Sequence, residues 1–186
     1  MIFKPIFLEG AYLIEPERRS DERGFFARTW CARELADHGL NTDIAQCNTS
    51  HSSSKGTLRG MHYQRPPFQE DKIVSCIRGA IFDVVIDLRV DSETYMRWFG
   101  VHLSEENGYM IYVPKGFAHG VQTLEDETRI SYLVTSTYAP AAEAGLRFDD
   151  PAFNIEWPLP VSVISSKDRL WPRFTNDDPR QVVAAM

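Results

Sequence analysis

The chain has 186 residues, of which 43% are hydrophobic and 25% charged, and its formal net charge is −6. An acidic balance argues against broad nucleic-acid binding, which needs a basic surface. No apolar run approaches the roughly 18 residues that cross a bilayer, and the first ten residues lack the cleavage site of a signal peptide. We therefore expect one domain over residues 1–186, with a less ordered tail from about residue 173 and no nucleic-acid or membrane partner.

The expected elements are mostly strands. A helix is predicted over residues 31–38, with Gly39 as its stop signal, and the Ser-rich run before Gly56 predicts a loop. The proline-rich residues 151–160 predict an irregular excursion, and residues 180–186 fit either a second helix or a frayed end. Period-two runs rich in Val, Ile, Tyr and Thr occupy residues 56–64, 72–79, 80–89, 99–104, 109–116, 120–125 and 128–138.

The three cysteines are odd in number and widely spaced, at Cys31, Cys47 and Cys76. They form no CxxC pair, so the sequence predicts neither a disulfide framework nor a zinc finger. A reducing cytoplasm fits this cysteine usage best.

About seven to ten short strands, separated by Gly, Pro and acidic turns, predict a sandwich or barrel. Two spacings narrow this class: Gly56 is followed by five residues and His62, and residues 108–119, GYMIYVPKGFAH, end in His119. These spacings resemble the two halves of the cupin signature, although the first half matches only at its start. The resemblance implies an all-β, cupin-type jelly-roll barrel with short peripheral helices and with both histidines near its interior.

A metal-binding cupin normally continues its first half with a second histidine and a glutamate. Here Gln64 stands at the second position, and Glu70 comes late. Imidazole binds Fe, Mn, Ni or Zn well, whereas an amide oxygen is a poor substitute. We therefore expect no metal, and a metal-dependent cupin enzyme stays open as an alternative.

A narrower resemblance covers roughly residues 3–172. The stretch GTLRGMHYQ, residues 56–64, is very similar to the strand that marks the dTDP-4-dehydrorhamnose 3,5-epimerase family. Further stretches follow in the family's order: DERGFF, QCN, QEDKIVSCIRGAIFDVVIDLR, VPKGFAHG, SYLVTSTY, LRFDDPAFNIEWP and SSKDR. The resemblance implies an isomerase without a cofactor. It would invert C3 and C5 of dTDP-4-dehydro-6-deoxy-glucose and yield dTDP-4-dehydro-rhamnose.

This chemistry needs a base on one face of the sugar, a proton donor on the other and a group that stabilises the C4 enolate. The resemblance implies His62 as the base, Tyr132 as the acid and Lys72 near the C4 oxygen, with Asp168 orienting His62. Imidazole titrates near neutral pH, which suits a base that must be regenerated. By residue pattern alone, Tyr132 also fits a core tyrosine, Asp168 a turn aspartate and Lys72 an exposed strand end.

The resemblance also implies residues that bind the dTDP-linked 4-keto-6-deoxyhexose. Arginine suits phosphate oxygens because its planar fork donates two hydrogen bonds, and a tyrosine can stack on the thymine ring. Arg23 lies far upstream of Arg59 in the sequence. The resemblance implies a homodimer in which the N-terminal segment, with Arg23, crosses to the partner. The implied binding residues are Arg23, Gln46, Asn48, Arg59, His119, Tyr138, Glu143 and Lys167.

Several positions depart from the residues usual in the family, and they leave open a single-centre epimerase that inverts C3 or C5 of a related nucleotide deoxysugar. A non-catalytic binding module that keeps the jelly roll is a further alternative, against which the full set of four implied catalytic residues counts. The departures are Arg28, Cys47, Thr49, Ser136 and the pair Glu70–Asp71.

Overall fold

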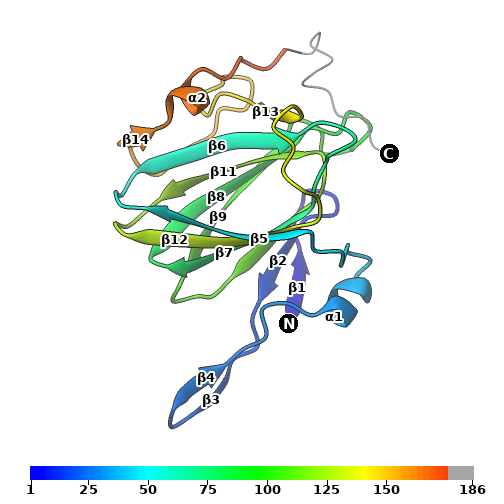
Figure 1. Ribbon diagram of the computed structural model, residues 1–186, viewed down its shortest axis with the longest axis vertical. Helices are drawn as coiled ribbons and strands as arrows, with labels where there is room; N and C mark the ends of the chain where they lie inside the picture. Colours follow the sequence, from blue (N-terminus) through cyan, green and yellow to red (C-terminus); the bar gives the residue numbers. More distant parts are fainter. Residues whose placement is uncertain (176–186) are drawn as a thin grey trace.

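The computed structural model describes residues 1–175, which are built on two facing sheets (Figure 1). The first sheet has the strand order β1 (Ile2–Pro5), β2 (Tyr12–Glu15), β10 (Met110–Val113), β7 (Lys72–Arg78), β12 (Thr128–Val134) and β5 (Gln46–Ser52). The second has the order β13 (Glu143–Gly145), β6 (Thr57–Gln64), β11 (Phe117–Thr123), β8 (Ala80–Asp87) and β9 (Trp98–Ser104). β14 (Val163–Ile164) pairs with β6 in parallel, and all other pairs are antiparallel. This architecture confirms the predicted all-β, jelly-roll class.

A hairpin and two short helices lie outside the two large sheets. β3 (Arg19–Asp21) and β4 (Gly24–Phe26) form a hairpin that projects away from the body of the molecule (Figure 1). α1 (Ala32–Ala36) confirms the helix predicted near residues 31–38, and Gly39 follows it with a φ of 72°. The other helix, α2 (Ser166–Arg169), is a single turn in the C-terminal segment.

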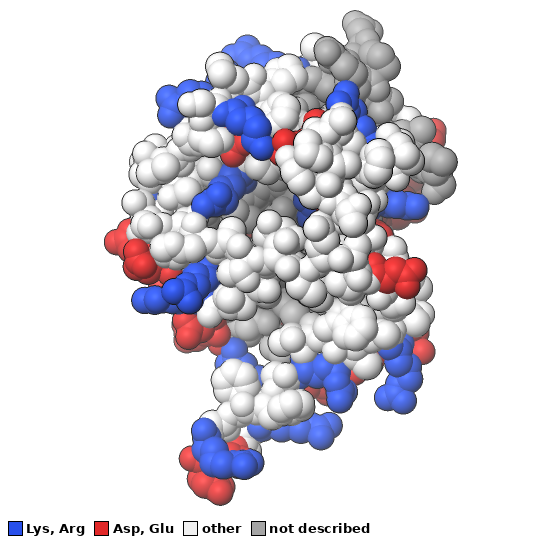
Figure 2. Space-filling view, viewed as in Figure 1, with Lys and Arg blue, Asp and Glu red and all other residues white. Residues whose placement is uncertain are grey.

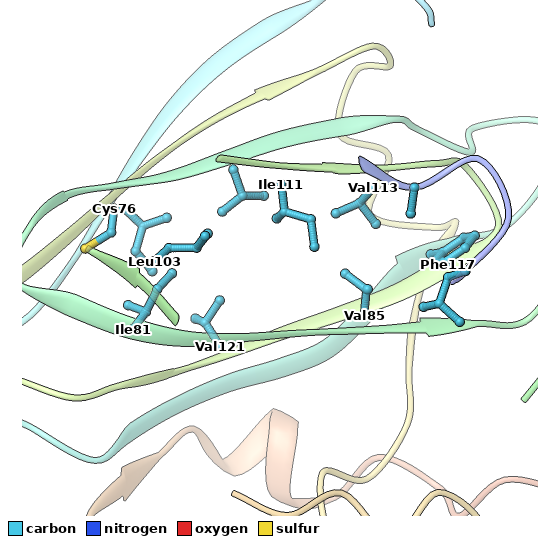
Figure 3. Close-up of a cluster of buried hydrophobic side chains, with 12 residues drawn as sticks. Cys76, Ile81, Val85, Leu103, Ile111, Val113, Phe117 and Val121 are labelled. Carbon is cyan, nitrogen blue, oxygen red and sulfur yellow. The ribbon is translucent and has the colours of Figure 1, made fainter. Parts of the chain in front are cut away.

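The main core lies between the two sheets (Figure 3). Alternate side chains of β8 point into it, as the period-two pattern predicts, and Ile81 and Val85 meet Ile111 and Val113 from β10. Burial of these branched side chains holds the sheets face to face. The sheets are thereby fixed as the two walls of an interior space.

The outer faces of both sheets are also covered. Val84 and Ile86, on the other face of β8, pack with Leu146, Phe153 and Phe174 from the C-terminal segment. This double burial explains why the sequence of β8 is nearly continuous in apolar residues. It also anchors the C-terminal segment along the second sheet. The outer face of the first sheet packs against α1.

The structure corrects two expectations. The start of the Ser-rich run, residues 50–52, belongs to the edge strand β5, because a half-exposed strand needs few apolar residues, and residues 53–56 form the predicted loop. Residues 1–175 also contain 14 strands, more than the seven to ten predicted, since several have only two to four residues. Residues 151–160 are irregular, as predicted. The proposed helix at 180–186 lies outside the described residues, and the single domain with a tail from about residue 173 stays a prediction. Among residues 1–175, no helix is long and apolar enough to span a membrane.

Candidate active site

The two sheets and the C-terminal segment enclose a cavity of about 560 Å³. Figure 2 shows the hollow on one face of the molecule, between β6 above and strands β5 and β12 below, with basic side chains around it. Seven of the implied functional residues line it together: Arg59, His62, Lys72, His119, Tyr132, Lys167 and Asp168.

β6 presents both Arg59 and His62 to this cavity. Residues three apart on a regular strand point to opposite faces. Gly60 lies between them with a φ of +128°, and the pairing with β11 shifts register between His119 and Val121. The irregularity turns the strand so that both side chains line one space.

His62 forms a close pair with Asp168. The Nε2 of His62 donates to Oδ1 of Asp168 at 2.6 Å, and the Gly60 amide donates to Oδ2 at 3.3 Å. Asp168 lies on α2, where the Ser165 side chain accepts from its backbone amide, and it is only 3% exposed. Because Nε2 carries the hydrogen, Nδ1 keeps its lone pair and can accept a proton.

The charge of Asp168 is secured by its hydrogen bonds. Burial raises the pKa of its carboxyl, but the hydrogen bond and charge of His62 and the donors of Gly60 and Ser165 outweigh burial, so the net pKa lies below its usual value. Asp168 is therefore an anion at neutral pH, and it stabilises an imidazolium at His62.

Tyr132 and Lys72 lie on the opposite wall. They come from β12 and β7 of the first sheet, and both border the same cavity as His62. Burial raises the pKa of Tyr132, and the nearby charge of Glu70 adds to this effect against the opposing influence of Arg59. The phenol therefore stays protonated at neutral pH and can donate. A group enclosed between the walls would have a base on one side and an acid on the other.

Most basic side chains of the cavity have their own carboxylate partner. Lys72 Nζ lies 3.0 Å from Oε1 of Glu70, and His119 Nε2 lies 2.9 Å from Oδ2 of the fully buried Asp83. The sequence reading missed both acidic partners as parts of the site. Asp83 carried a signal, since it is the only charged residue inside the apolar run AIFDVV.

Arg59 differs from the other lining cations. Its Nε donates to the Ser52 hydroxyl at 3.1 Å and its Nη2 to the His51 carbonyl at 2.8 Å, and both acceptors are neutral. Within residues 1–175 its hydrogen bonds therefore leave its charge without a carboxylate, which suits it to an anionic ligand.

A second cavity, of about 460 Å³, adjoins the first and shares His62, Lys72 and Tyr132 with it. The Tyr138 amide donates to Oε1 of Gln46 at 2.9 Å, and its hydroxyl donates to Glu143 at 3.1 Å. Four implied binding residues line this second space: Gln46, Asn48, Tyr138 and Glu143.

Glu143 joins the two cavities, because its Oε1 accepts from Lys167 Nζ at 2.6 Å. Burial raises the pKa of Glu143, but the bonds from Lys167 and Tyr138 outweigh burial and lower it overall. The hydrogen bond from Lys167 keeps this rim of the site ordered and charged.

One expected binding residue, Arg23, lies elsewhere. Arg23 is on the projecting hairpin, pairs with Asp21 and does not line the cavity of its own chain. Gln64 is engaged by the backbone, donating to the Phe68 carbonyl at 2.9 Å and accepting from the Ala139 amide at 2.7 Å. Within residues 1–175, no three His, Cys, Asp or Glu side chains are grouped as a metal site would require.

The chain is similar to known proteins over most of its length. The family model for dTDP-4-dehydrorhamnose 3,5-epimerase matches residues 5–176. A protein of that name from Sinorhizobium fredii is 44% identical, with 92% of this chain and 89% of the relative covered. A dTDP-4-dehydrorhamnose 3-epimerase from Streptomyces niveus is 38% identical, with 91% of this chain and 82% of the relative covered.

A solved structure is similar over the whole chain. The dTDP-6-deoxy-D-glucose-3,5-epimerase of Legionella pneumophila, in complex with dTDP-4-keto-L-rhamnose, superposes with a TM-score of 0.92 at 34% identity. The match covers 100% of this chain and 98% of that one. The family model, the relatives and the fold thus confirm the resemblance in the sequence: the chain belongs to the dTDP-4-dehydrorhamnose 3,5-epimerase family.

Proposed function

We propose that this chain is an isomerase that inverts C3 and C5 of dTDP-4-dehydro-6-deoxy-glucose and produces dTDP-4-dehydro-rhamnose. The observation that carries the proposal is the placement of the His62–Asp168 pair and the protonated Tyr132 on opposite walls of one cavity. Family membership supplies the substrate class, since relatives carry this activity in their names.

The reaction begins with loss of a proton beside the C4 carbonyl. His62 Nδ1 takes the C3 proton, and the electrons of the C–H bond move to the C4 oxygen, where Lys72 stabilises the enolate. Tyr132 then donates its proton to C3 from the opposite face, and the C4 carbonyl re-forms. Asp168 holds the imidazolium that arises at His62.

The site must be reset before C5 reacts. His62 releases its proton to water and Tyr132 regains one, after which the same two groups act at C5. The His62 side chain is 31% exposed, so it has the access to solvent that this exchange needs. No redox cofactor takes part, because the C4 carbonyl itself makes both protons acidic.

The remaining polar residues of the two cavities are proposed to bind the nucleotide. Arg59, which has no carboxylate partner within residues 1–175, is suited to the diphosphate, with His119 and Lys167 beside it. Gln46, Asn48, Tyr138 and Glu143 line the adjoining cavity, which supports their assignment to the thymidine.

The proposed enzyme is a homodimer that exchanges its N-terminal hairpins. Arg23 projects from the body, and Phe25 and Phe26 beside it are 59% and 65% exposed. Large exposed apolar side chains on a projecting segment favour a covered surface in an assembly. Arg23 would then complete the site of the partner. A cytoplasmic location also stays a prediction, supported by three free cysteines.

A single-centre epimerase is the second candidate, because the relative from Streptomyces niveus is named a 3-epimerase. Incubation with substrate in D₂O after dialysis against EDTA, followed by mass spectrometry of the product, separates the cases. Two incorporated deuterons support the double epimerase, and one supports the single-centre enzyme. No incorporation before EDTA treatment contradicts both, and incorporation that EDTA abolishes indicates the metal-dependent alternative.

A further inference from the structure

The partner of the catalytic histidine is supplied by a short element of the C-terminal segment. Asp168 lies on α2, a four-residue helix, and only two residues of β14 pair with β6 ahead of it. After α2, Arg147 donates from its backbone amide to Pro172 and from Nη1 to the Arg169 carbonyl, both at 3.4 Å. These bonds are longer than usual for N–H···O contacts. The carboxylate of Asp168 is itself held by His62 and the Gly60 amide, whereas these long hydrogen bonds to Arg147 hold the chain directly after α2.

The aromatic ring of Trp171 supplies a firmer anchor three residues after Asp168. Gly145 of β13 pairs directly with His62 in the sheet, and a Cβ added there would lie 2.4 Å from Trp171 Cε2. The indole thus occupies the space where a side chain at position 145 would stand. It meets the imidazole of His62 edge to face, with ring centroids 6.3 Å apart.

The contact depends on the shape of the ring. The indole Nε1 is buried and has no hydrogen-bond partner within residues 1–175. Its nitrogen therefore contributes no bond that holds the segment, and the flat ring against Gly145 and His62 is what remains. Phe174, buried further along, fixes the chain beyond it.

We propose that Trp171 is a positioning residue: its indole ring packs on Gly145 and thereby holds α2 where Asp168 can accept from His62 Nε2. This inference rests on the proposed function in one respect: the proposed function makes the His62–Asp168 pair part of the catalytic machinery. Loss of the ring lets α2 shift, and misplacement of a catalytic group by about 1 Å costs on the order of 10²-fold in rate.

The test compares Trp171→Ala with Trp171→Phe, and Trp157→Phe serves as a control because Trp157 packs against Phe82, away from His62. The first variant is expected to lower kcat by about 10- to 100-fold, with KM and dTDP affinity unchanged. Phenylalanine is expected to restore most of kcat, since a flat ring still fits over Gly145. Thermal unfolding of each variant shows that it is folded.

A double-mutant cycle separates positioning from general stability. In an Asp168→Ala background there is no carboxylate to place, so Trp171→Ala is expected to cost nothing further. An equal loss of kcat in both backgrounds, or no loss in either, overturns the proposal.

A readout without substrate tests the same contact independently of activity. The ¹⁵N shifts of His62 at pH 8, assigned with His62→Asn, are expected to show the Nε2–H tautomer in the wild type and a mixture in Trp171→Ala. If the wild type has no epimerase activity but its His62 tautomer differs from that in Trp171→Ala, the proposed function is contradicted and the positioning role is supported. Unchanged tautomers in Trp171→Ala contradict the positioning role.

Discussion

Single residues carry out the two proton transfers. Tyr132 is the proposed acid, and its alternative role is that of a core tyrosine. Its hydroxyl keeps its proton because burial and Glu70 raise its pKa. Tyr132→Phe removes the donor and leaves His62 in place, so proton loss from the substrate is expected to continue while completed inversion slows by about 10²–10⁴-fold. Solvent-deuterium exchange and product formation, measured in parallel, give the two rates. Equal effects on both rates, or none on either, would make Tyr132 a packing residue.

Asp168 adds a pH dependence to stability. Its pKa is lowered in the folded chain, so its contribution is complete above the ordinary carboxyl pKa of about 3.9 and is lost as pH falls through the lower folded value. The free energy of unfolding of the wild type is expected to fall more steeply below about pH 4 than that of Asp168→Asn. Urea unfolding between pH 5 and pH 2 measures this difference. Parallel curves for the two proteins would show that the Asp168 pairing does not stabilise the fold.

At the scale of elements, the irregular centre of β6 places the histidine. Gly60 has a φ of +128°, and a Cβ there would lie 2.6 Å from the Gly120 Cα. Gly60→Ala is expected to lower the free energy of unfolding by about 1–3 kcal/mol or more, and to lower kcat because His62 moves. Gly24→Ala is a matched control, with a φ of +126° and nothing within 4 Å of its Cβ. If urea unfolding shows equal losses for both variants, the close approach to β11 is not what requires glycine.

The sequence predicts the strands that bury a period-two face, and it is weakest where burial is not the organising force. β8 is recognisable because both its faces are covered, whereas β5 is polar and is held mainly by pairing with β12. β14 has only two residues, and it forms because the C-terminal segment pairs with β6 in parallel. Short and polar strands of this kind carry no periodic signal.

The same limit applies to the site. His62, Lys72 and Tyr132 were expected from a resemblance, and the structure brings them to one cavity because the two sheets face each other. Glu70 as the partner of Lys72, and Asp83 as the partner of His119, were not expected. The pairing of Asp83 on β8 with His119 on β11 depends on strand register, which the sequence alone does not give.

At the scale of the whole molecule, the central prediction is a site shared between two chains. Arg23→Ala and His62→Asn are each expected to be inactive as homodimers, while co-expression of the two restores activity. In a mixed dimer, the chain with intact His62 receives Arg23 from its partner. Half of the dimers are mixed and each has one intact site, so roughly a quarter of wild-type activity is expected.

The control combines two variants whose changed residues belong to the same chain's part of the site. Co-expression of His62→Asn with Asp168→Ala leaves no complete site, because both groups come from the same chain. No recovery is expected there. Recovery absent from both mixtures would contradict the exchange of hairpins.

Proton NMR in D₂O, with the 4-keto-6-deoxyglucose nucleotide generated in place and no metal added, tests the account most directly. If His62 removes a proton from each carbon beside C4, the C3 and C5 proton signals both disappear with wild-type enzyme, and both persist with His62→Asn. Loss of a single signal would mean that one centre is inverted. Two persisting signals with folded wild-type protein would contradict the epimerase account.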